Sequence, residues 1–227
     1  MANKQLITSW SNSKYGTWEK CPAAYKYARI DKIPQPPSPH ADRGVFIHSK
    51  GEQFLKGNIR GVPPEFKKFS DELRAMKKYK AIPEQKWAFS KGWKPCDWEN
   101  HSIIWLRGIT DAHLYDEEER ELVIVDFKTG RHYPSHKGQG ELYSVMGLAM
   151  YPDLLSCTIE FWYLDSGDFL TWTYDLAHVK RLKTKWTRRA SLMLAEKKFA
   201  PTPSENSCKW CSFKASKGGP CKKEWKE

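Results

Sequence analysis

Two charged residues close an apolar stretch near the middle of the chain, in "ELVIVDFKTG", residues 121–130. Asp126 ends the apolar run, and Lys128 follows two positions later. Because side chains alternate along a strand, a strand here would direct Asp126 and Lys128 to one face and Phe127 to the other. A pattern this short is usually a solvated strand end at which Asp126 and Lys128 form an ion pair. Only the surrounding sequence can show whether the two residues instead serve a reactive site.

A second carboxylate, Asp111 in "RGITDAHL", occurs near the end of the preceding strand candidate. The polar stretch "DEEER" separates the two strands and predicts an antiparallel hairpin, which would bring Asp111 beside Asp126. Two carboxylates so close repel each other unless a cation lies between them, and an oxygen-rich site of this kind suits Mg²⁺ or Mn²⁺. A neighbouring lysine could then orient an attacking water and offset charge that develops on a phosphate.

Two further pairs of polar residues flank these strands at helical spacing. His48 and Glu52, in "GVFIHSKGE", are four residues apart, and so are Gln139 and Tyr143 in "QGELY". Residues at i and i+4 share one face of a helix, so each pair could point at a common site. Alone, a histidine beside an apolar helix face, such as His48, is more often a surface or core residue than a ligand, and Glu52 is more often solvated.

The ordered set His48, Asp111, Asp126-x-Lys128 and Gln139-x-x-x-Tyr143 resembles the PD-(D/E)XK nuclease superfamily, in its RecB-like branch. That branch carries "GxxxH", an aspartate after the second core strand, "DxK" followed by Thr and Gly, and "QxxxY", and all four occur here in this order. The resemblance implies a set of divalent-metal ligands for Mg²⁺ or Mn²⁺: His48, Asp111, Asp126 and the carbonyl of Phe127, with Glu52 as an outer ligand.

The same resemblance implies catalytic roles beside the two aspartates. Lys128 would position the attacking water and stabilise the transition state, while Gln139 and Tyr143 would contact the phosphate or the lysine. Thr129 and Gly130 complete the motif, and glycine there would allow a tight exit from the strand.

Four of the six cysteines gather toward the two ends of the chain. "NSCKWCSFKASKGGPC" holds Cys208 and Cys211 in C-x2-C and, after nine further residues, Cys221; Cys21 lies near the start. C-x2-C lets two thiolates grip one metal from a tight turn, as in zinc and iron–sulfur sites. One early and three late cysteines resemble the [4Fe–4S] staple of AddB-type and CRISPR-associated nucleases of this branch. The gap before Cys221 is longer than in that family, so zinc and an empty reduced site stay open as alternatives.

The two remaining cysteines, Cys96 and Cys157, stand alone and are interpreted as structural. The N-terminal stretch lacks a basic segment followed by an apolar run, which predicts a cytoplasmic protein. The resemblance to phage-type nucleases implies that the cell is bacterial or phage-infected. In that reducing compartment, six cysteines argue against a disulfide framework. No stretch reaches the roughly 18 uninterrupted apolar residues of a membrane helix, so no membrane partner is expected.

The order of the predicted elements indicates an α/β fold, a restriction-endonuclease-like core with a central mixed sheet flanked by helices. Phe66, Phe69, Leu73 and Met76 mark an amphipathic helix, and a helix around residues 43–57 is expected to bury Val45, Phe46, Phe54 and Leu55. The remaining elements are expected as helices at 11–20, after Pro22, at 137–151 and at 177–198, an extended linker at 31–40, and strands at 85–90, 103–116, 121–129, 157–165 and 169–176. A single nuclease domain is expected over 1–227, with a catalytic core at 44–175 and a cysteine cluster region formed by 1–30 and 200–227.

Lys and Arg total 38 against 27 Asp and Glu, a formal charge of +11 that favours a polyanionic partner such as nucleic acid. The resemblance then implies a divalent-metal-dependent DNA exonuclease acting on single strands or duplex ends in recombination, repair or phage DNA metabolism, and leaving 5′ phosphates. The chain has no P-loop sequence, so any helicase or recombination motor would be a separate partner. Two alternatives stay open: a CRISPR-adaptation nuclease, and a non-catalytic DNA-binding module with a structural metal site.

Overall fold

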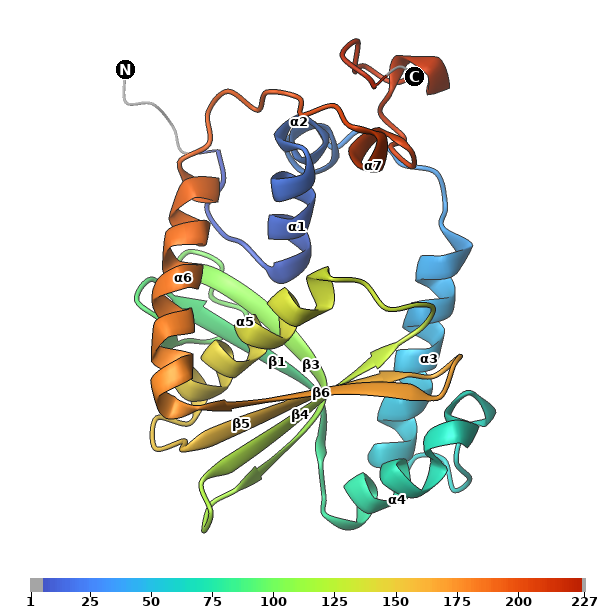
Figure 1. Ribbon diagram of the computed structural model, residues 1–227, viewed down its shortest axis with the longest axis vertical. Helices are drawn as coiled ribbons and strands as arrows, with labels where there is room; N and C mark the ends of the chain where they lie inside the picture. The colour runs from blue at the N-terminus through green and yellow to red at the C-terminus, as the bar shows by residue number, and fades with distance from the viewer. Residues whose placement is uncertain (1–5, 226–227) are drawn as a thin grey trace. The chain divides into compact units, whose positions relative to one another are not determined.

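The apolar segments in the middle of the chain pair into one six-stranded sheet, shown in the computed structural model, which describes residues 6–225 (Figure 1). The order in the sheet is β2-β1-β3-β4-β5-β6; β4 and β5 run parallel, and the other neighbours are antiparallel. The expected mixed sheet and both expected hairpins, β3–β4 and β5–β6, are confirmed. The strands are β1 (Ile82–Ser90), β2 (Lys94–Pro95), β3 (Ile104–Asp116), β4 (Glu121–Lys128), β5 (Ser156–Tyr163) and β6 (Asp168–Asp175).

One face of the sheet packs on α3 (Pro39–Leu55), the 3-10 helix η2 (Pro64–Phe69) and α4 (Ser70–Lys78). Phe127 of β4 lies in this core with its ring centre 4.8 Å from that of Phe66, and Phe69 stacks on Trp162 at 5.2 Å. The expected amphipathic face is therefore confirmed, and Leu73 and Met76 are buried with it.

Helix α3 begins within the proline-rich segment, because Ser38 caps it and Pro39 occupies its first turn, where a missing N–H costs nothing. The expected burial of Val45 and Phe46 is wrong: these side chains are 73% and 52% exposed. The expected burial of Phe54 and Leu55 is confirmed, and the buried face of α3 is completed by Ile47 and Gly51, so that the four are spaced i, i+4, i+7 and i+8.

The opposite face of the sheet is covered by α5 (Ser135–Met150). The helix comes so close to β4 that a Cβ on Gly147 would clash with the end of the Leu122 side chain. Leu122, Asp126 and Lys128 are separated by even numbers of residues along β4, so their side chains lie on the same face of the sheet. These two charged side chains therefore point toward α5, while Phe127 enters the core on the other face, as the sequence predicts.

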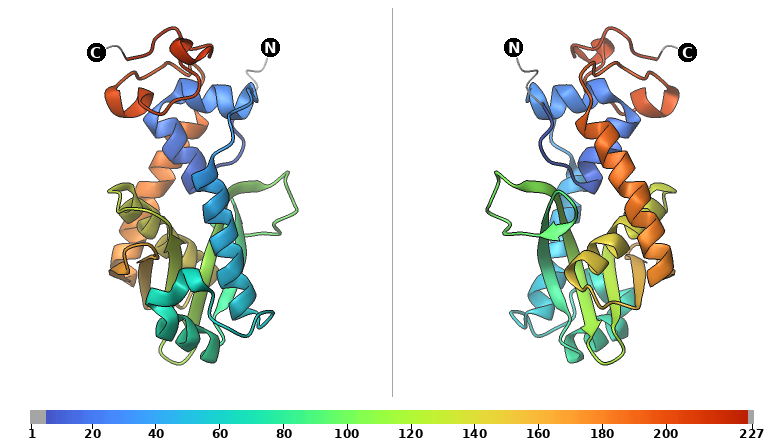
Figure 2. Two further views of the ribbon diagram at one scale, coloured as in Figure 1. Left: turned by 90° about the vertical axis from the view of Figure 1, so that its right-hand side faces the viewer. Right: turned by 90° about the vertical axis from the view of Figure 1, so that its left-hand side faces the viewer.

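The chain divides into two compact units, Ser38–Trp186 and Met1–Pro37 with Thr187–Glu227. The second unit joins segments from both ends of the chain, whose ribbons lie side by side in Figure 2. Thr202 Oγ1 donates to the Lys20 carbonyl at 2.9 Å, and Trp18 Nε1 donates to Glu196 at 3.3 Å. The expectation of a single nuclease domain over 1–227 stays a prediction.

The other described helices are α1 (Asn12–Lys20), α2 (Pro22–Tyr25), the π-helix η1 (Lys26–Ile30), α6 (Leu176–Leu194), α7 (Glu205–Cys208) and the 3-10 helix η3 (Ala215–Lys217). The helices expected at 11–20, after Pro22 and at 177–198 are thereby confirmed within a few residues. Of the described helices, none combines the length and the apolar character that a membrane span requires.

Candidate active site and cysteine pocket

Asp126 lies near the end of β4 at the centre of a buried polar network. Its Oδ2 accepts hydrogen bonds from Gln139 Nε2 at 2.7 Å and from Tyr143 Oη at 2.8 Å. Lys128 Nζ lies 2.6 Å from Asp126 Oδ1 and donates to Gln139 Oε1 at 2.9 Å. The structure thus brings together four residues that the sequence singled out, two on β4 and two one turn apart on α5.

The two oxygens of Asp126 have different surroundings. Oδ2 is satisfied, whereas Oδ1 is buried and has no hydrogen bond. Lys128 Nζ is at ion-pair distance from Oδ1 but lies off the direction of a hydrogen bond, so the contact is electrostatic. Carboxylate oxygens are the ligands that a hard divalent cation prefers.

Asp111 is the second buried carboxylate, 7% exposed, and it lies against the same stretch of β4. Its Oδ2 accepts from the backbone N–H of Phe127 at 2.6 Å, and its Oδ1 is 3.0 Å from His48 Nδ1. Burial and the neighbouring charge of Asp126 raise the pKa of Asp111, against the hydrogen bonds from His48 and Phe127. The antiparallel register, with Ala112 opposite Val125, explains why the two aspartates meet.

His48 reaches this carboxylate from α3. Burial disfavours its charged form, but the hydrogen bond to Asp111, the charges of Asp111 and Asp126 and the Phe127 backbone outweigh burial and raise the pKa of His48 to about 9. In the metal-free protein the imidazolium therefore balances part of the acidic charge. Of the three side-chain ligands that the resemblance implies, His48 and Asp111 lie in direct contact, and the Phe127 N–H donates to Asp111.

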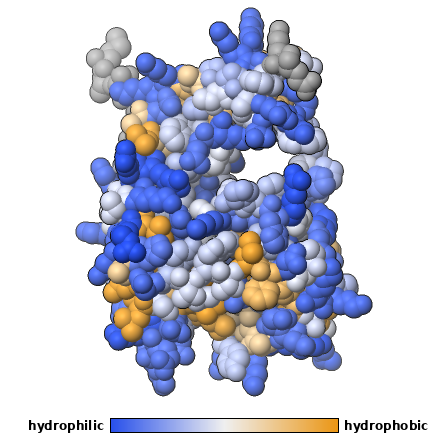
Figure 3. Space-filling model, in the orientation of Figure 1, coloured by the Kyte–Doolittle hydropathy of each residue, from blue (hydrophilic) through white to orange (hydrophobic). Residues whose placement is uncertain are grey.

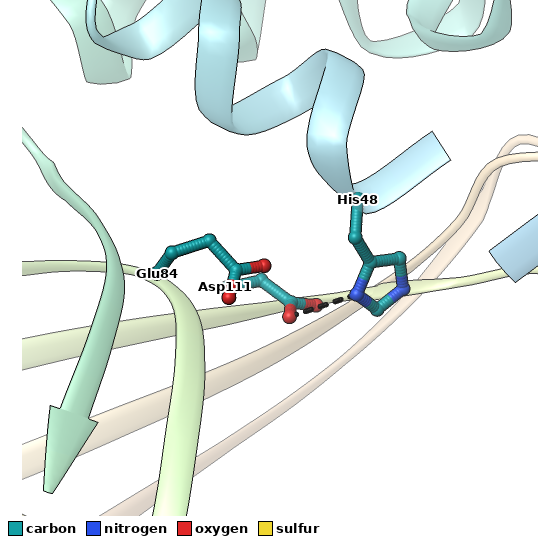
Figure 4. A group of neighbouring side chains, drawn as sticks. All are labelled: His48, Glu84 and Asp111. Carbon is teal, nitrogen blue, oxygen red and sulfur yellow. Dashed lines mark ion pairs between the residues drawn. The ribbon is translucent and has the colours of Figure 1, made fainter. Parts of the chain in front are cut away.

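Glu84 is a site residue that the sequence analysis missed. The nearest ligand atoms of Glu84, His48 and Asp111 all lie within 4.8 Å of one another, and the three side chains converge in Figure 4. Glu84 has a φ of 48°, a left-handed conformation unusual for a non-glycine residue in a strand. Burial and then the charges of Asp111 and Glu52 raise its pKa. Such strain concentrates at functional sites.

The expected strand started at residue 85, and for that reason Glu84 fell just outside it. The only available signal was an acidic residue directly before the strand that pairs with the Asp111 strand. In the structure the pairs Pro83–Ala112 and Gln85–Thr110 flank Glu84 and Asp111.

The remaining motif residues lie at the edge of this site. Glu52 is paired with Lys56 at 2.5 Å and does not belong to the group formed by His48, Glu84 and Asp111. Gly130 has a φ of 97°, which glycine adopts readily, and its N–H donates to Asp165 at 2.9 Å. Asp165 also pairs with Arg43 of α3, so the exit from β4 is tied to the helix that carries His48.

Four cysteines line one pocket in the unit that joins the chain ends: Cys21, Cys208, Cys211 and Cys221. The Cys211 N–H donates to the Cys208 carbonyl at 3.1 Å, which gives C-x2-C its tight turn. The long segment before Cys221 folds back, because the Cys221 N–H donates to the Phe213 carbonyl at 2.9 Å. Cys221 is therefore brought to the same pocket as Cys21, Cys208 and Cys211 despite the longer gap.

The thiols of this pocket are unpaired by disulfides, and no three of the described cysteine sulfurs lie within 4.8 Å of one another. Cys208 accepts a hydrogen bond from the Trp225 N–H at 3.3 Å. Although burial opposes ionisation, hydrogen bonds from Trp225, Ser207 and Ser204 lower the pKa of Cys208. Cys157 is buried in β5 and Cys96 follows β2; neither lines this pocket.

A sequence model of the PD-(D/E)XK nuclease superfamily matches residues 9–216, nearly the whole chain. The chain belongs to the PD-(D/E)XK nuclease superfamily. The family expected from the motifs is thus confirmed, and for a PD-(D/E)XK nuclease the substrate class is DNA. Its assignment to the RecB-like or AddB-like branch stays a prediction.

Solved structures share the fold of this PD-(D/E)XK protein. The crystal structure of SSO0001 matches with a TM-score of 0.50 and 18% identity, covering 99% of this chain and 91% of the other. A candidate exonuclease from Eubacterium rectale matches with a TM-score of 0.51 and 14% identity, covering 82% of this chain and 80% of the other. No curated protein matches the sequence.

Proposed function

We propose that this protein is a divalent-metal-dependent DNA exonuclease of the RecB-like branch, acting on single strands or duplex ends. The observation that carries the proposal is the adjacent pair of buried carboxylates, Asp111 and Asp126, with the amine of Lys128 on one side and His48 and Glu84 on the other. The fold shared with a candidate exonuclease supports attack at DNA ends.

The donor set fits a hard divalent cation. Carboxylate oxygens, a backbone carbonyl and one imidazole suit Mg²⁺ or Mn²⁺, and the buried Oδ1 of Asp126 lacks a hydrogen bond. When bound, the ion supplies Lewis acidity and lowers the pKa of water. The proposed ligands are His48, Asp111, Asp126 and the carbonyl of Phe127, and the structure adds Glu84 to those that the sequence suggested.

Lys128 supplies a positive charge where a pentacoordinate phosphate gains negative charge. Gln139 fixes its position, accepting from Lys128 Nζ through Oε1 while donating to Asp126 through Nε2. Tyr143 donates to the same carboxylate oxygen and so helps to leave Oδ1 for the cation. Gln139 and Tyr143 are in this view positioning residues, while Lys128 faces the substrate and orients the water.

The test is cleavage of labelled linear DNA with Mg²⁺ or Mn²⁺ by the full chain and by Asp126→Asn and Lys128→Ala. We expect each variant to lose activity by at least about a hundredfold, because Asp126→Asn weakens the set of metal ligands and Lys128→Ala removes the positive charge beside the reacting phosphate. Asp116→Asn, at the far end of the same hairpin, and Lys78→Ala, on the exposed side of α4, are the matched controls and should retain activity.

If both site variants cleave as fast as the controls, the site assignment fails. DNA binding without cleavage by the wild type, at every metal concentration tried, would instead favour the non-catalytic DNA-binding module. End preference is read from the same gels by comparing linear with closed circular DNA, since an exonuclease spares the circle.

We further propose that Cys21, Cys208, Cys211 and Cys221 hold a structural [4Fe–4S] cluster joining the two chain ends. The four side chains line one pocket, and the Trp225 N–H donates to a thiol sulfur, an interaction that tunes cluster ligands. A single tetrahedral zinc, with Zn–S distances of about 2.3 Å, is the alternative that the same four thiolates could hold. The cluster would hold the fold and take no part in hydrolysis.

Anaerobic purification tests this centre. We expect brown protein with about four iron and four sulfide per chain, and a Cys208→Ser variant that is bleached and melts at lower temperature. Cys96→Ser, at a thiol outside the pocket, is the control and should keep its colour. A colourless protein that holds one zinc per chain would refute the cluster.

A further inference from the structure

Five aromatic rings, which we call the ring row, lie beside Lys128. Two come from the loop that joins β4 to α5, one from α5 and two from β5: His132 and Tyr133, His136, and Phe161 and Tyr163. Tyr133, 49% exposed, lies with its ring centre 5.5 Å from that of His136, in an edge-to-face arrangement. The guanidinium of Arg131 lies 5.4 Å from the centre of the Tyr133 ring, and Arg131 Nε donates to Tyr133 Oη at 3.3 Å. An exposed ring is thus held in place by a neighbouring cation instead of by burial.

The rings of the loop and of α5 pack against the buried rings Tyr163 and Phe161 of β5. His132 lies against Tyr163 with ring centres 3.7 Å apart, and Tyr163 itself is fully buried. Tyr163 Oη is 2.6 Å from His136 Nδ1, and His136 stacks on Phe161 at 5.7 Å. Because β5 anchors both Tyr163 and Phe161, the outer rings have a rigid support.

This ring row adjoins the proposed catalytic group. Lys128 is the register partner of Tyr163 across the parallel pair β4–β5. Lys128 Nζ is 4.8 Å from the centre of the Phe161 ring, the ring on which His136 stacks. The Phe161 ring therefore contacts both the Lys128 amine, which would face the scissile phosphate, and His136 of the ring row.

We propose that Tyr133 and His132 form a stacking platform for the unpaired nucleobase next to the scissile phosphate, with Arg131 contacting the adjoining phosphate. Every base has a π face, so the platform would accept any sequence but require an unpaired base. This deepens the proposed nuclease function, on which it rests, by making a single strand or a frayed end the preferred substrate. None of these rings has a role in the core of α3 and α4, which lies on the other face of the sheet.

Binding is measured without cleavage, in EDTA, by fluorescence anisotropy of a labelled single-stranded oligonucleotide. We expect Tyr133→Ala to weaken binding about 5- to 100-fold, and His132→Ala by a smaller factor in the same direction. Tyr133→Phe keeps a stacking ring and should bind like the wild type. Tyr79→Ala is the matched control, because Tyr79 is 66% exposed and also has a lysine, Lys78, over its ring.

A second readout reports stacking itself. The oligonucleotide carries 2-aminopurine, whose fluorescence falls when it stacks on an aromatic ring, at successive positions from the end. One position should be quenched by the wild type and by Tyr133→Phe, and much less by Tyr133→Ala. An abasic residue at that position should weaken wild-type binding by the same factor as Tyr133→Ala, and should have no further effect on that variant.

The two proposals fail separately. Equal binding by Tyr133→Ala and Tyr79→Ala, with no quenched position, would overturn the stacking platform while leaving the cleavage assay untouched. Loss of binding in Tyr133→Phe as large as in Tyr133→Ala would also overturn it, since the hydroxyl and not the ring face would then be responsible. A wild type that shows the quenched position but never cuts DNA would contradict the nuclease function and support the platform.

Discussion

At the scale of single residues, the site is defined by charge held away from water. Asp111 and Asp126 are both buried, and the pKa of Asp111 is raised by its burial and by Asp126. In the metal-free protein His48 and Lys128 offset this charge by direct contact. A divalent cation would offset it more strongly, and Glu84, whose carboxylate is aimed at the same point, would then gain a direct ligand role.

Glu84 and Glu52 are two nearby acids with different expected roles, which allows a matched comparison. Glu84→Gln should weaken Mn²⁺ binding about tenfold or more, because the substitution removes a negative charge beside the proposed ligands His48 and Asp111. Glu52→Gln should change the Kd less than about twofold, because Glu52 is paired with Lys56 outside the ligand group.

Isothermal titration calorimetry with Mn²⁺, without DNA, measures both variants against the wild type. A Glu84→Gln protein that binds Mn²⁺ as tightly as the wild type would remove Glu84 from the site. A large effect of Glu52→Gln alone would restore Glu52 as the acidic ligand that the sequence suggested.

At the scale of elements, α3 delivers His48 to the end of the sheet by packing closely over β4. Gly51 is the contact point: a Cβ there would lie 2.7 Å from a Phe127 ring carbon and 2.8 Å from one of Phe66. Both rings are buried and packed against each other at 4.8 Å, so neither can move aside cheaply. The absence of one side chain thus sets the distance between the histidine helix and the strand that carries Asp126.

Gly51→Ala should lower the free energy of unfolding by about 1–3 kcal/mol, because overpacking outweighs the gain in helix propensity. Gly44→Ala in the same helix is the control, since its nearest neighbour would be Thr129 Oγ1 at an ordinary 3.8 Å. That variant should be neutral or up to about 1 kcal/mol more stable. Urea unfolding of the two proteins decides, and a Gly51→Ala protein as stable as Gly44→Ala would contradict the close packing of α3.

At the scale of the whole molecule, the stability of the fold is expected to fall in acid because the core holds the neutral form of His113. His113 is fully buried in β3, with its ring 5.1 Å from that of Trp87 and its Nε2 3.0 Å from Tyr151 Oη. Burial lowers the pKa of His113 to about 4. The unfolded chain takes up this proton near pH 6.5, whereas the folded chain does so only near pH 4. Stability from this group is therefore complete above the unfolded pKa and is lost as pH falls toward the folded one.

Lowering the pH from about 7.5 to about 5 should cost roughly 2 kcal/mol of unfolding free energy through His113 alone. Urea unfolding followed by tryptophan fluorescence, in EDTA, measures this loss for the wild type and for His113→Gln. The variant is expected to be less stable at neutral pH but to lose about 2 kcal/mol less on acidification. An identical loss in both proteins would show that His113 does not govern the acid sensitivity.

The sequence by itself determined the strands other than the two-residue β2, the two hairpins β3–β4 and β5–β6, and the grouping of the polar residues. A period of two in β4 separates Asp126 and Lys128 from Phe127, and a spacing of four on α5 aligns Gln139 with Tyr143; both are local geometry. The buried face of η2 and α4 followed from the same kind of periodicity. The pairing of β3 with β4 required only a short polar turn, and it brought Asp111 to Asp126.

Only the tertiary structure decided features that depend on what packs against a segment. The exposure of Val45 and Phe46 is one of them, since helical spacing gives an apolar stripe but not the neighbour that covers it. The position of Glu84 is another, because the register of β1 on β3 and a left-handed backbone at Glu84 place this residue near His48 and Asp111. No sequence pattern predicts either feature. The ring row beside Lys128 depends on the parallel pairing of β4 with β5, which joins segments separated by a whole helix. Residue types and their local spacing indicated the candidate site residues, and long-range packing decided which of those residues lie in contact.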